Sequence, residues 1–247
     1  MVVSPAAVGS ASIAQPRYWW YQARESLLRA ALGQYVGDAR RVLDVGSADG
    51  PSVGWLRGSA SLASLDIDPR GLSAGGVCGS ALALPFASES FDVVAAFDVV
   101  EHCDPESTAL AELSRVLTPG GRLLVSVPAY QWAWTHFDDV NGHHRRYTRR
   151  RASAAVAAQG LVVERATYAF MSTFPMFAAE RLYRRLRERA AGRHPGLAPG
   201  EVPPLPHVNP LVHRLLILLC SIDARLLRKR DLPFGSSVLV AATKPTR

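Results

Sequence analysis

The sequence has few cysteines and no long apolar run, and both shortages limit what the protein can be. Its three cysteines, Cys78, Cys103 and Cys220, are odd in number and widely spaced. They predict neither a disulfide framework nor a zinc knuckle, and they indicate a reduced, cytoplasmic environment. The longest apolar stretch, Leu215 to Cys220, is far shorter than the roughly 20 residues that span a bilayer. Residues 1–15 also lack the basic start and apolar run of a signal peptide.

Two common nucleotide-binding motifs are missing as well. The segment from Gly46 to Gly50 reads as a glycine turn, but the dinucleotide pattern Gly-x-Gly-x-x-Gly would need further glycines at Ala48 and Pro51. No Gly-Lys-Ser/Thr occurs, which excludes a P-loop. The turn is therefore expected to bind neither a dinucleotide nor a P-loop nucleotide, and it either binds a ligand of another class or binds none.

The composition is that of an ordinary globular protein. The chain has 247 residues, of which 48% are hydrophobic and 20% charged, and this length suits one α/β catalytic unit with an appended piece. The formal net charge is +7, and basic residues concentrate in the C-terminal half. This charge permits attraction to nucleic acid, anionic lipid or an acidic small molecule.

Apolar strand patterns alternate with helical patterns along the chain, as a parallel sheet covered by helices on both faces requires. We expect helices at 18–35, 51–57, 148–159, 175–191 and 211–230, and one from an Asp104 cap to the turn at Pro119. We expect strands at 41–45, 62–67, 76–78, 91–97, 122–127, 161–168 and 236–243. The predicted fold is a Rossmann-like, doubly wound α/β sheet of seven strands, mostly parallel, with an antiparallel last strand.

A helical insertion precedes the predicted last strand. The expected organisation is an N-terminal helical cap (1–40), a ligand-binding domain (41–170 and 234–247) and the insertion (171–233). One apolar helical face recurs in the insertion, and we expect it to pack on the domain or on a second copy, with peripheral membrane contact as the alternative. Its residues are Leu211, Leu215, Leu218, Leu219, Ile222 and Leu226.

The turn after the first strand predicts a small-molecule site. Glycines let the backbone approach a ligand closely, and the following helix start offers free N–H groups to an anionic group. A second acidic strand end, Asp66 with Asp68 two residues later, comes one βαβ unit further along. A carboxylate there can accept both hydroxyls of a ribose, and Asp66 is the preferred candidate.

Several ordered motifs resemble the type 11 class I methyltransferases, and the likeness runs over nearly the whole chain. They are the segments 17–24, 42–50, 79–86, 90–94, 98–102, 115–122, 127–130, 142–148 and 232–235. The resemblance implies S-adenosylmethionine as the methyl donor and S-adenosylhomocysteine as the product. It assigns the donor to Asp44, Gly46, Ser47, Ala48, Gly50, Asp66, Ile67, Ser80, Ala81 and Asp98. Two positions depart from the family pattern: Ala48 stands for a usual glycine, and Ser80, a weaker and neutral partner for the adenine, stands for a usual aspartate.

Asp98, Glu101 and His102 follow the fourth strand, where such enzymes meet donor and acceptor. Their spacing resembles the metal-binding stretch of ubiquinone-pathway O-methyltransferases and small-RNA 3′-terminal methyltransferases, and two carboxylates with an imidazole suit Mg²⁺ or Mn²⁺. Metal-free relatives share the pattern, however. In them the acid caps a helix, and the histidine that corresponds to His102 lies beside the donor. We expect no metal, and we take His102 as a catalytic candidate.

The segment from Tyr130 to Tyr147 is predicted to be a polar, aromatic-rich loop that forms a lid over the ligand crevice, because it follows the fifth strand. His143 is the candidate general base, since the pKa of histidine lies near neutrality. The alternative is a structural lid in which a histidine bonds Asp138 or Asp139 and the arginines are solvated. The candidate acceptor-binding residues are Tyr130, Trp134, His144, Arg145, Arg146 and Tyr147.

The sequence therefore predicts a methyltransferase, with O-methylation of a small or glycan-linked, possibly anionic acceptor as the leading hypothesis. An RNA methyltransferase is the alternative that the basic C-terminal half supports, although nucleic acid is the less favoured partner. A non-catalytic donor-binding or scaffold protein is the alternative from another class. A homodimer is compatible with all three, and the sequence leaves the methylated atom open.

Overall fold

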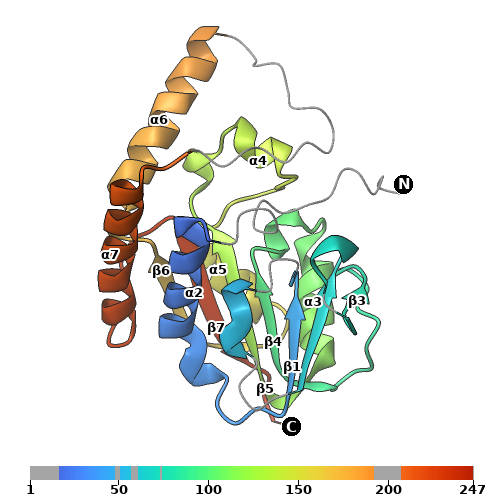
Figure 1. The fold of residues 1–247 in the computed structure, drawn as a ribbon. Helices are drawn as coiled ribbons and strands as arrows, with labels where there is room; N and C mark the ends of the chain where they lie inside the picture. Colours follow the sequence, from blue (N-terminus) through green and yellow to red (C-terminus); the bar gives the residue numbers. More distant parts are fainter. Residues whose placement is uncertain (1–16, 48–50, 57–60, 73, 192–206, 247) are drawn as a thin grey trace.

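A computed structural model describes residues 17–47, 51–56, 61–72, 74–191 and 207–246 (Figure 1). Its centre is a seven-stranded sheet with the order β3-β2-β1-β4-β5-β7-β6. The strands are β1 (Arg41–Val45), β2 (Ser61–Asp66), β3 (Val77–Cys78), β4 (Phe91–Phe97), β5 (Leu117–Pro128), β6 (Val162–Ala169) and β7 (Ser237–Thr243). All seven predicted strands are confirmed, with small shifts at most ends. The exception is β5, which begins at Leu117 and includes Pro119, where a turn was expected.

The sheet is parallel except at β7, which runs antiparallel to both of its neighbours. The carboxyl ends of β1, β2, β4 and β5 consequently meet at one edge, where the connecting turns leave the sheet. In a doubly wound sheet this edge is where ligands bind. The predicted fold class, including the antiparallel last strand, is confirmed.

The central strands form the core because they are almost wholly apolar. In β4 and β7 nearly every residue is buried, since helices cover both faces of these strands. Helix α2 (Trp19–Leu32) packs against α7 (Pro210–Leu227) on one face, whereas α3 (Glu106–Val116) and α5 (Arg149–Ala157) cover the opposite face (Figure 1). All three cysteines are free thiols, as predicted.

Three local predictions need correction. The helix after the first turn is a 3-10 helix, Pro51–Leu56. Asp104 does not cap α3, which begins at Glu106 with Pro105 as its N-cap; Asp104 instead accepts a hydrogen bond from Arg145 at 2.5 Å. The lid is not a plain loop, because it contains a 3-10 helix, Gln131–Ala133, and the short helix α4 (His136–Val140).

The insertion forms two helices between β6 and β7, α6 (Phe174–Ala191) and α7, which lie along one side of the molecule (Figure 1). The predicted packing of its apolar face on the domain is wrong for four of the six residues. Leu211, Leu215, Leu218 and Ile222 are exposed, while α7 buries another set that includes Leu216, Cys220 and Leu227. Among the described residues, no helix is long and apolar enough to cross a membrane.

Candidate active site

The turn after β1 requires a glycine at its first position. Gly46 has φ +76°, and a Cβ at this position would lie 2.3 Å from the Cγ2 of Val99. Its amide donates to the carbonyl of Leu65 at 2.8 Å, which ties the turn to the end of β2. Ser47 follows, buried, and its hydroxyl has no hydrogen-bond partner within the described part of the chain. A buried hydroxyl at a strand end can serve a ligand.

The rest of the predicted donor loop is only partly visible. Ala48 and Gly50 lie outside the described residues. Asp44 is buried one residue before the end of β1.

The acid at the end of β2 is Asp66 and not Asp68. Asp66 is buried, and its Oδ1 accepts the amide of Asp68 at 2.8 Å. Asp68 forms an ion pair with Arg70 at 2.5 Å and also caps the 3-10 helix Pro69–Gly71. Ile67 between them is 56% exposed, so an apolar side chain faces solvent beside the acid. This arrangement leaves Asp66 as the residue whose position suits a ribose.

The loop after β3 is held against the end of β2. The amide of Gly79 donates to the carbonyl of Asp66 at 2.9 Å. Ser80 accepts the amide of Leu82 at its hydroxyl, at 3.2 Å, and Ala81 is buried. The two predicted adenine-side residues therefore lie near the predicted ribose acid.

Asp98, directly after β4, is fixed by partners that the sequence does not reveal. Its Oδ2 accepts from the Nε of Arg24 at 2.7 Å, and its Oδ1 accepts from the hydroxyl of Ser126 at 2.9 Å. Arg24 is buried in α2 and also donates to the carbonyl of Phe97 at 2.9 Å. Asp98 thus joins the N-terminal helix to the sheet, and both of its oxygens have protein partners.

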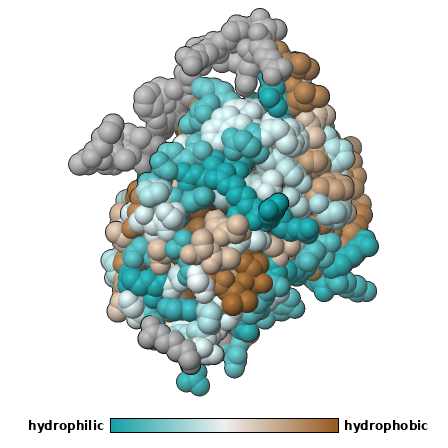
Figure 2. Space-filling model, turned by 180° about the vertical axis from the view of Figure 1, so that it is seen from behind, coloured by the Kyte–Doolittle hydropathy of each residue, from teal (hydrophilic) through white to brown (hydrophobic). Residues whose placement is uncertain are grey.

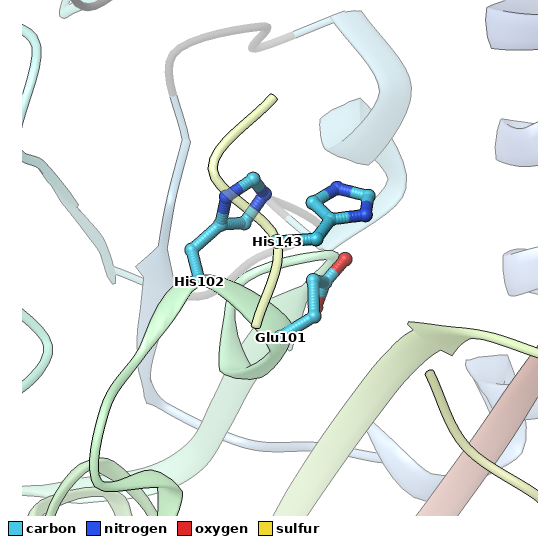
Figure 3. Close-up of side chains that lie close together, drawn as sticks. All are labelled: Glu101, His102 and His143. Atoms are coloured by element: carbon cyan, nitrogen blue, oxygen red, sulfur yellow. The ribbon is translucent and has the colours of Figure 1, made fainter. Parts of the chain in front are cut away.

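Glu101, His102 and His143 come together although 41 positions separate the second histidine from the first. Each offers one ligand atom, and these atoms lie within 4.8 Å of one another. The two imidazole rings meet edge to face with centroids 4.6 Å apart, and the carboxyl of Glu101 points towards His143 (Figure 3). The lid supplies His143, whereas the 3-10 helix Val100–His102 supplies the other two.

The charge states in this cluster are unusual. Glu101 is 1% exposed, and burial, followed by the charge of Asp98, raises the pKa of its carboxyl well above the usual range. Its Oε2 has no hydrogen-bond partner in the described part of the protein. Although His102 reaches solvent, desolvation of its ring, followed by the charge of His143, lowers its pKa to about 4. The cluster therefore combines a carboxyl whose raised pKa favours the protonated form with a His102 ring that is neutral at neutral pH.

His143 is oriented by a buried carboxylate. Its Nδ1 lies 3.0 Å from the Oδ1 of Asp138, which also accepts from the Nε of Arg146 at 2.7 Å. Burial alone would raise the pKa of Asp138, but its hydrogen bond with His143 and the charge of Arg146 lower it to about 2. The ionised Asp138 holds the proton of His143 at Nδ1, so that Nε2 can accept a proton.

Three lid residues predicted to bind the acceptor, Arg145, Arg146 and Tyr147, have protein partners instead. Arg146 is buried and forms an ion pair with Asp138. Arg145 forms an ion pair with Asp104 and donates to the carbonyl of Cys103 at 2.6 Å. Tyr147 is 1% exposed and its hydroxyl donates to Glu106. The structural alternative for the lid is therefore right about the contact between a histidine and Asp138 and wrong about solvated arginines.

The other predicted acceptor residues remain near the surface. Tyr130 stacks on Tyr168 with centroids 5.3 Å apart, and burial with this neighbour raises its pKa to about 12. The indole of Trp134 donates to Asp139 at 3.0 Å. His144 is exposed, and its amide donates to the carbonyl of Glu101 at 2.8 Å, which joins the lid to the cluster.

The strand order, the antiparallel β7 and the glycine turn after β1 together define the class: this is a class I methyltransferase fold. Residues 43–125 match the family model of the type 11 methyltransferases, described as a methyltransferase domain. Residues 43–125 therefore form a methyltransferase domain similar to that of this family.

Relatives and solved structures agree on the domain. The demethylmenaquinone methyltransferase of Mycolicibacterium paratuberculosis is 34% identical over 121 residues, which are 46% of this chain and 50% of that protein. The chain thus matches about half the length of such curated relatives. Phosphoethanolamine N-methyltransferase 2 of Haemonchus contortus, in complex with S-adenosyl-L-methionine, has a TM-score of 0.52 at 16% identity, covering 97% of this chain and 61% of that one. The [4+2]-cyclase SpnF has a TM-score of 0.55 at 18% identity, covering 90% and 81%. At these identities the structures support the fold alone.

Proposed function

We propose that the protein binds S-adenosylmethionine at the edge formed by β1, β2 and β4 and transfers its methyl group to a hydroxyl oxygen of an acceptor held under the lid. The observation that carries the proposal is the His143–Asp138 pair, at 3.0 Å, beside the carboxyl end of β4 in a methyltransferase domain. S-adenosylhomocysteine would be the second product.

The residues at this edge fit the donor. Gly46 lets the turn pass close to Val99, and Asp66 ends β2 where a ribose would lie. Ser47 offers a buried hydroxyl that has no hydrogen-bond partner among the described residues. The bound donor supplies an electrophilic methyl group. Asp98 supports the site by fixing α2 to the sheet through Arg24. Ser80 and Ala81 complete the proposed adenine side.

His143 acts as the general base. Its Nε2 takes the proton of the acceptor hydroxyl while the acceptor oxygen forms its bond to the methyl carbon, and Asp138 stabilises the imidazolium that results. His102 is neutral at neutral pH because its pKa is about 4. Its ring lies edge-on to that of His143 and can accept a hydrogen bond without adding a positive charge to the site. The raised pKa of Glu101 favours a protonated carboxyl, which could donate a hydrogen bond to the acceptor oxygen. A base is needed because a hydroxyl is a weak nucleophile while protonated.

A divalent cation is the second candidate for activating the hydroxyl. Glu101, His102 and His143 offer three ligand atoms within 4.8 Å, and Asp138 behind His143 is the carboxylate partner that metal-bound histidines usually have. Such an ion would lower the pKa of the acceptor hydroxyl directly. Metal binding would require Glu101 to lose its proton, so affinity would rise with pH. Activity that survives chelation and is unchanged by Mg²⁺, Mn²⁺ or Zn²⁺ would favour the base.

The alternatives are weaker. An RNA acceptor would draw on basic side chains at the lid, yet Arg145 and Arg146 there are already paired. A steep loss of affinity with salt would restore that hypothesis. A protein that binds the donor without methyl transfer is the other alternative, and the cyclase with the same fold shows why turnover must be tested.

Donor binding is tested by calorimetry with S-adenosylmethionine. Asp66→Ala removes the proposed ribose contact and should weaken binding about tenfold or more. Asp68→Ala serves as the matched control, because that carboxylate already pairs with Arg70, and it should change the affinity much less. Equal affinities for the two variants would show that the ribose acid has been misassigned.

A further inference from the structure

The outer side of the insertion exposes an apolar surface that the proposed activity does not use. Figure 2 shows apolar side chains gathered along the edge of the molecule that α6 and α7 form. We call this surface the flank face. It consists of Leu182 and Leu186 of α6 and Leu211, Leu215, Leu218 and Ile222 of α7, each between 42% and 72% exposed.

The flank face is not the side of α7 that packs on the rest of the protein. The opposite side of α7 is already packed on α2 and buries Leu216, Cys220 and Leu227. Buried Asp223 accepts the amide of Ser172 at 2.9 Å, which fixes the helix where the insertion begins. The exposed residues of α7 recur at spacings of four, three and four, which places them on one stripe of the helix. Packing therefore holds the stripe outward.

Positive charge borders the flank face. Exposed Arg214 and Arg225 lie next to the stripe of α7, and exposed Arg187 lies next to that of α6. The chain just after α7 continues with Arg228, Lys229 and Arg230, all exposed. The acidic residue within α7, Asp223, is buried on the other side. An apolar stripe bordered by cations is the pattern of a helix that lies in a membrane interface.

We propose that the flank face binds the surface of an anionic lipid bilayer, with α6 and α7 lying along the interface. The leucines enter the boundary between headgroups and acyl chains, and the arginines contact lipid phosphates. A second copy of the chain fits less well, because a symmetric contact would bring the same arginine-bordered faces together.

The contact would place the lid beside the lipid. Arg181 of α6 donates to the hydroxyl of Thr135 and lies 3.7 Å from Asp138, and Arg185 donates to the carbonyl of Trp132 at 2.7 Å. An acceptor anchored in the bilayer would thus approach the site from the side where α6 meets the lid. This last step rests on the proposed function, whereas lipid binding itself does not.

Vesicle flotation tests the proposal with two compositions, phosphatidylcholine alone and phosphatidylcholine with about one third phosphatidylglycerol. The protein should float with the anionic vesicles and bind the neutral ones at least about tenfold more weakly, and added salt should reduce the binding. Absence of binding to anionic vesicles overturns the proposal without any variant.

Matched variants locate the contact. Leu215→Glu should weaken binding about tenfold or more, whereas Val162→Glu, at a residue 57% exposed on β6, should not. Arg225→Glu should weaken vesicle binding, while Arg150→Glu, at an exposed residue of α5, should have little effect. Equal effects within either pair of variants overturn the assignment. If the protein does not bind vesicles but forms a dimer that Leu215→Glu dissociates, the flank face binds a second copy and the proposal is also overturned. Vesicle binding without transfer of a labelled methyl group from S-adenosylmethionine to an acceptor would instead count against the proposed function.

Discussion

A single carboxylate, Asp138, connects the structure of the lid with its proposed chemistry. It is fully buried and accepts hydrogen bonds from the lid backbone, from Arg146 and from His143. The same contacts that close the lid therefore set the tautomer of His143. A buried pair of this kind is costly to break, because the remaining partner keeps a charge without compensation.

Asp138→Asn should lower the free energy of unfolding by about 3 kcal/mol, since it leaves the guanidinium of Arg146 buried without its anion. Asp139→Asn is the control: its side chain is 58% exposed, and the loss should stay below about 1 kcal/mol. Urea unfolding monitored by fluorescence measures both. A similar loss in the two variants would contradict the buried ion pair.

The lowered pKa of Asp138 also predicts an acid dependence. A carboxyl whose pKa falls from 3.8 to about 2 on folding adds stability that is present above pH 4 and is lost as the pH falls through 2. The fall in stability between pH 4 and pH 2 should consequently be smaller in Asp138→Asn than in the unmodified protein. Parallel curves of unfolding free energy against pH would show that Asp138 does not titrate as described.

His143→Gln should reduce kcat by about 10²-fold to 10⁴-fold, because the variant can no longer take the proton of the acceptor hydroxyl. The dissociation constant of S-adenosylmethionine should change less than about twofold, since His143 is assigned to the acceptor. His144→Gln is the neighbouring control, because His144 is exposed and binds Glu101 through its backbone amide. An unchanged kcat in His143→Gln would remove the base from the mechanism.

Gly46→Ala should destabilise the fold by about 3 kcal/mol, because its Cβ would lie 2.3 Å from Val99 in a left-handed backbone conformation. Gly37→Ala shares the positive φ, at +54°, but has open space, and should cost about 1 kcal/mol. Adding Val99→Ala to Gly46→Ala should recover part of the loss. Thermal unfolding decides, and equal losses at the two glycines would contradict the close approach.

At the scale of elements, β-branched and apolar runs predicted every strand, because a buried strand needs little beyond such a run. The cap of α3 was misplaced because Pro105 takes the N-cap position and Asp104 turns to Arg145. The outward stripe of α7 was also missed, since periodicity reveals that a helix has an apolar face but not which way it points.

The site was predictable only where its residues share a motif. The donor turn and Asp66 follow from strand ends, whereas the contact of Arg24 with Asp98 joins residues 74 positions apart. The partners of Arg145 and Tyr147 each lie 41 positions away, so the sequence suggested acceptor-binding side chains where the fold has internal contacts. Long-range ion pairs leave no local signal.

One guanidinium holds two helices to the sheet. Arg165 of β6 donates to the carbonyl of Ala31 in α2 and to that of Leu227 in α7, each at 2.7 Å, and pairs with Asp231 at 2.7 Å. Arg165→Ala should lower the free energy of unfolding by about 2 kcal/mol, because the last carbonyls of both helices lose a charged donor. Arg184→Ala, at an exposed pair with Glu180, should cost less than about 0.5 kcal/mol. Hydrogen exchange that leaves α7 as protected as before would contradict this role.

At the scale of the whole molecule, the two halves of the sheet divide the work. The edge of β1, β2 and β4 carries the proposed donor site, while the lid after β5 and the insertion before β7 surround the acceptor side. The net charge of +7 is consistent with an anionic partner for the second half. Internal pairing takes up much of the lid's charge, while Arg214 and Arg225 of the insertion remain exposed.

Transfer of a labelled methyl group tests the central claim most directly. The protein is incubated with cell extract, including its lipid fraction, and S-adenosylmethionine carrying a deuterated methyl group, and the products are analysed by mass spectrometry. The account predicts a labelled methyl ether that His143→Gln largely abolishes and His144→Gln does not. Donor binding without any labelled product, or equal labelling by His143→Gln, would contradict it.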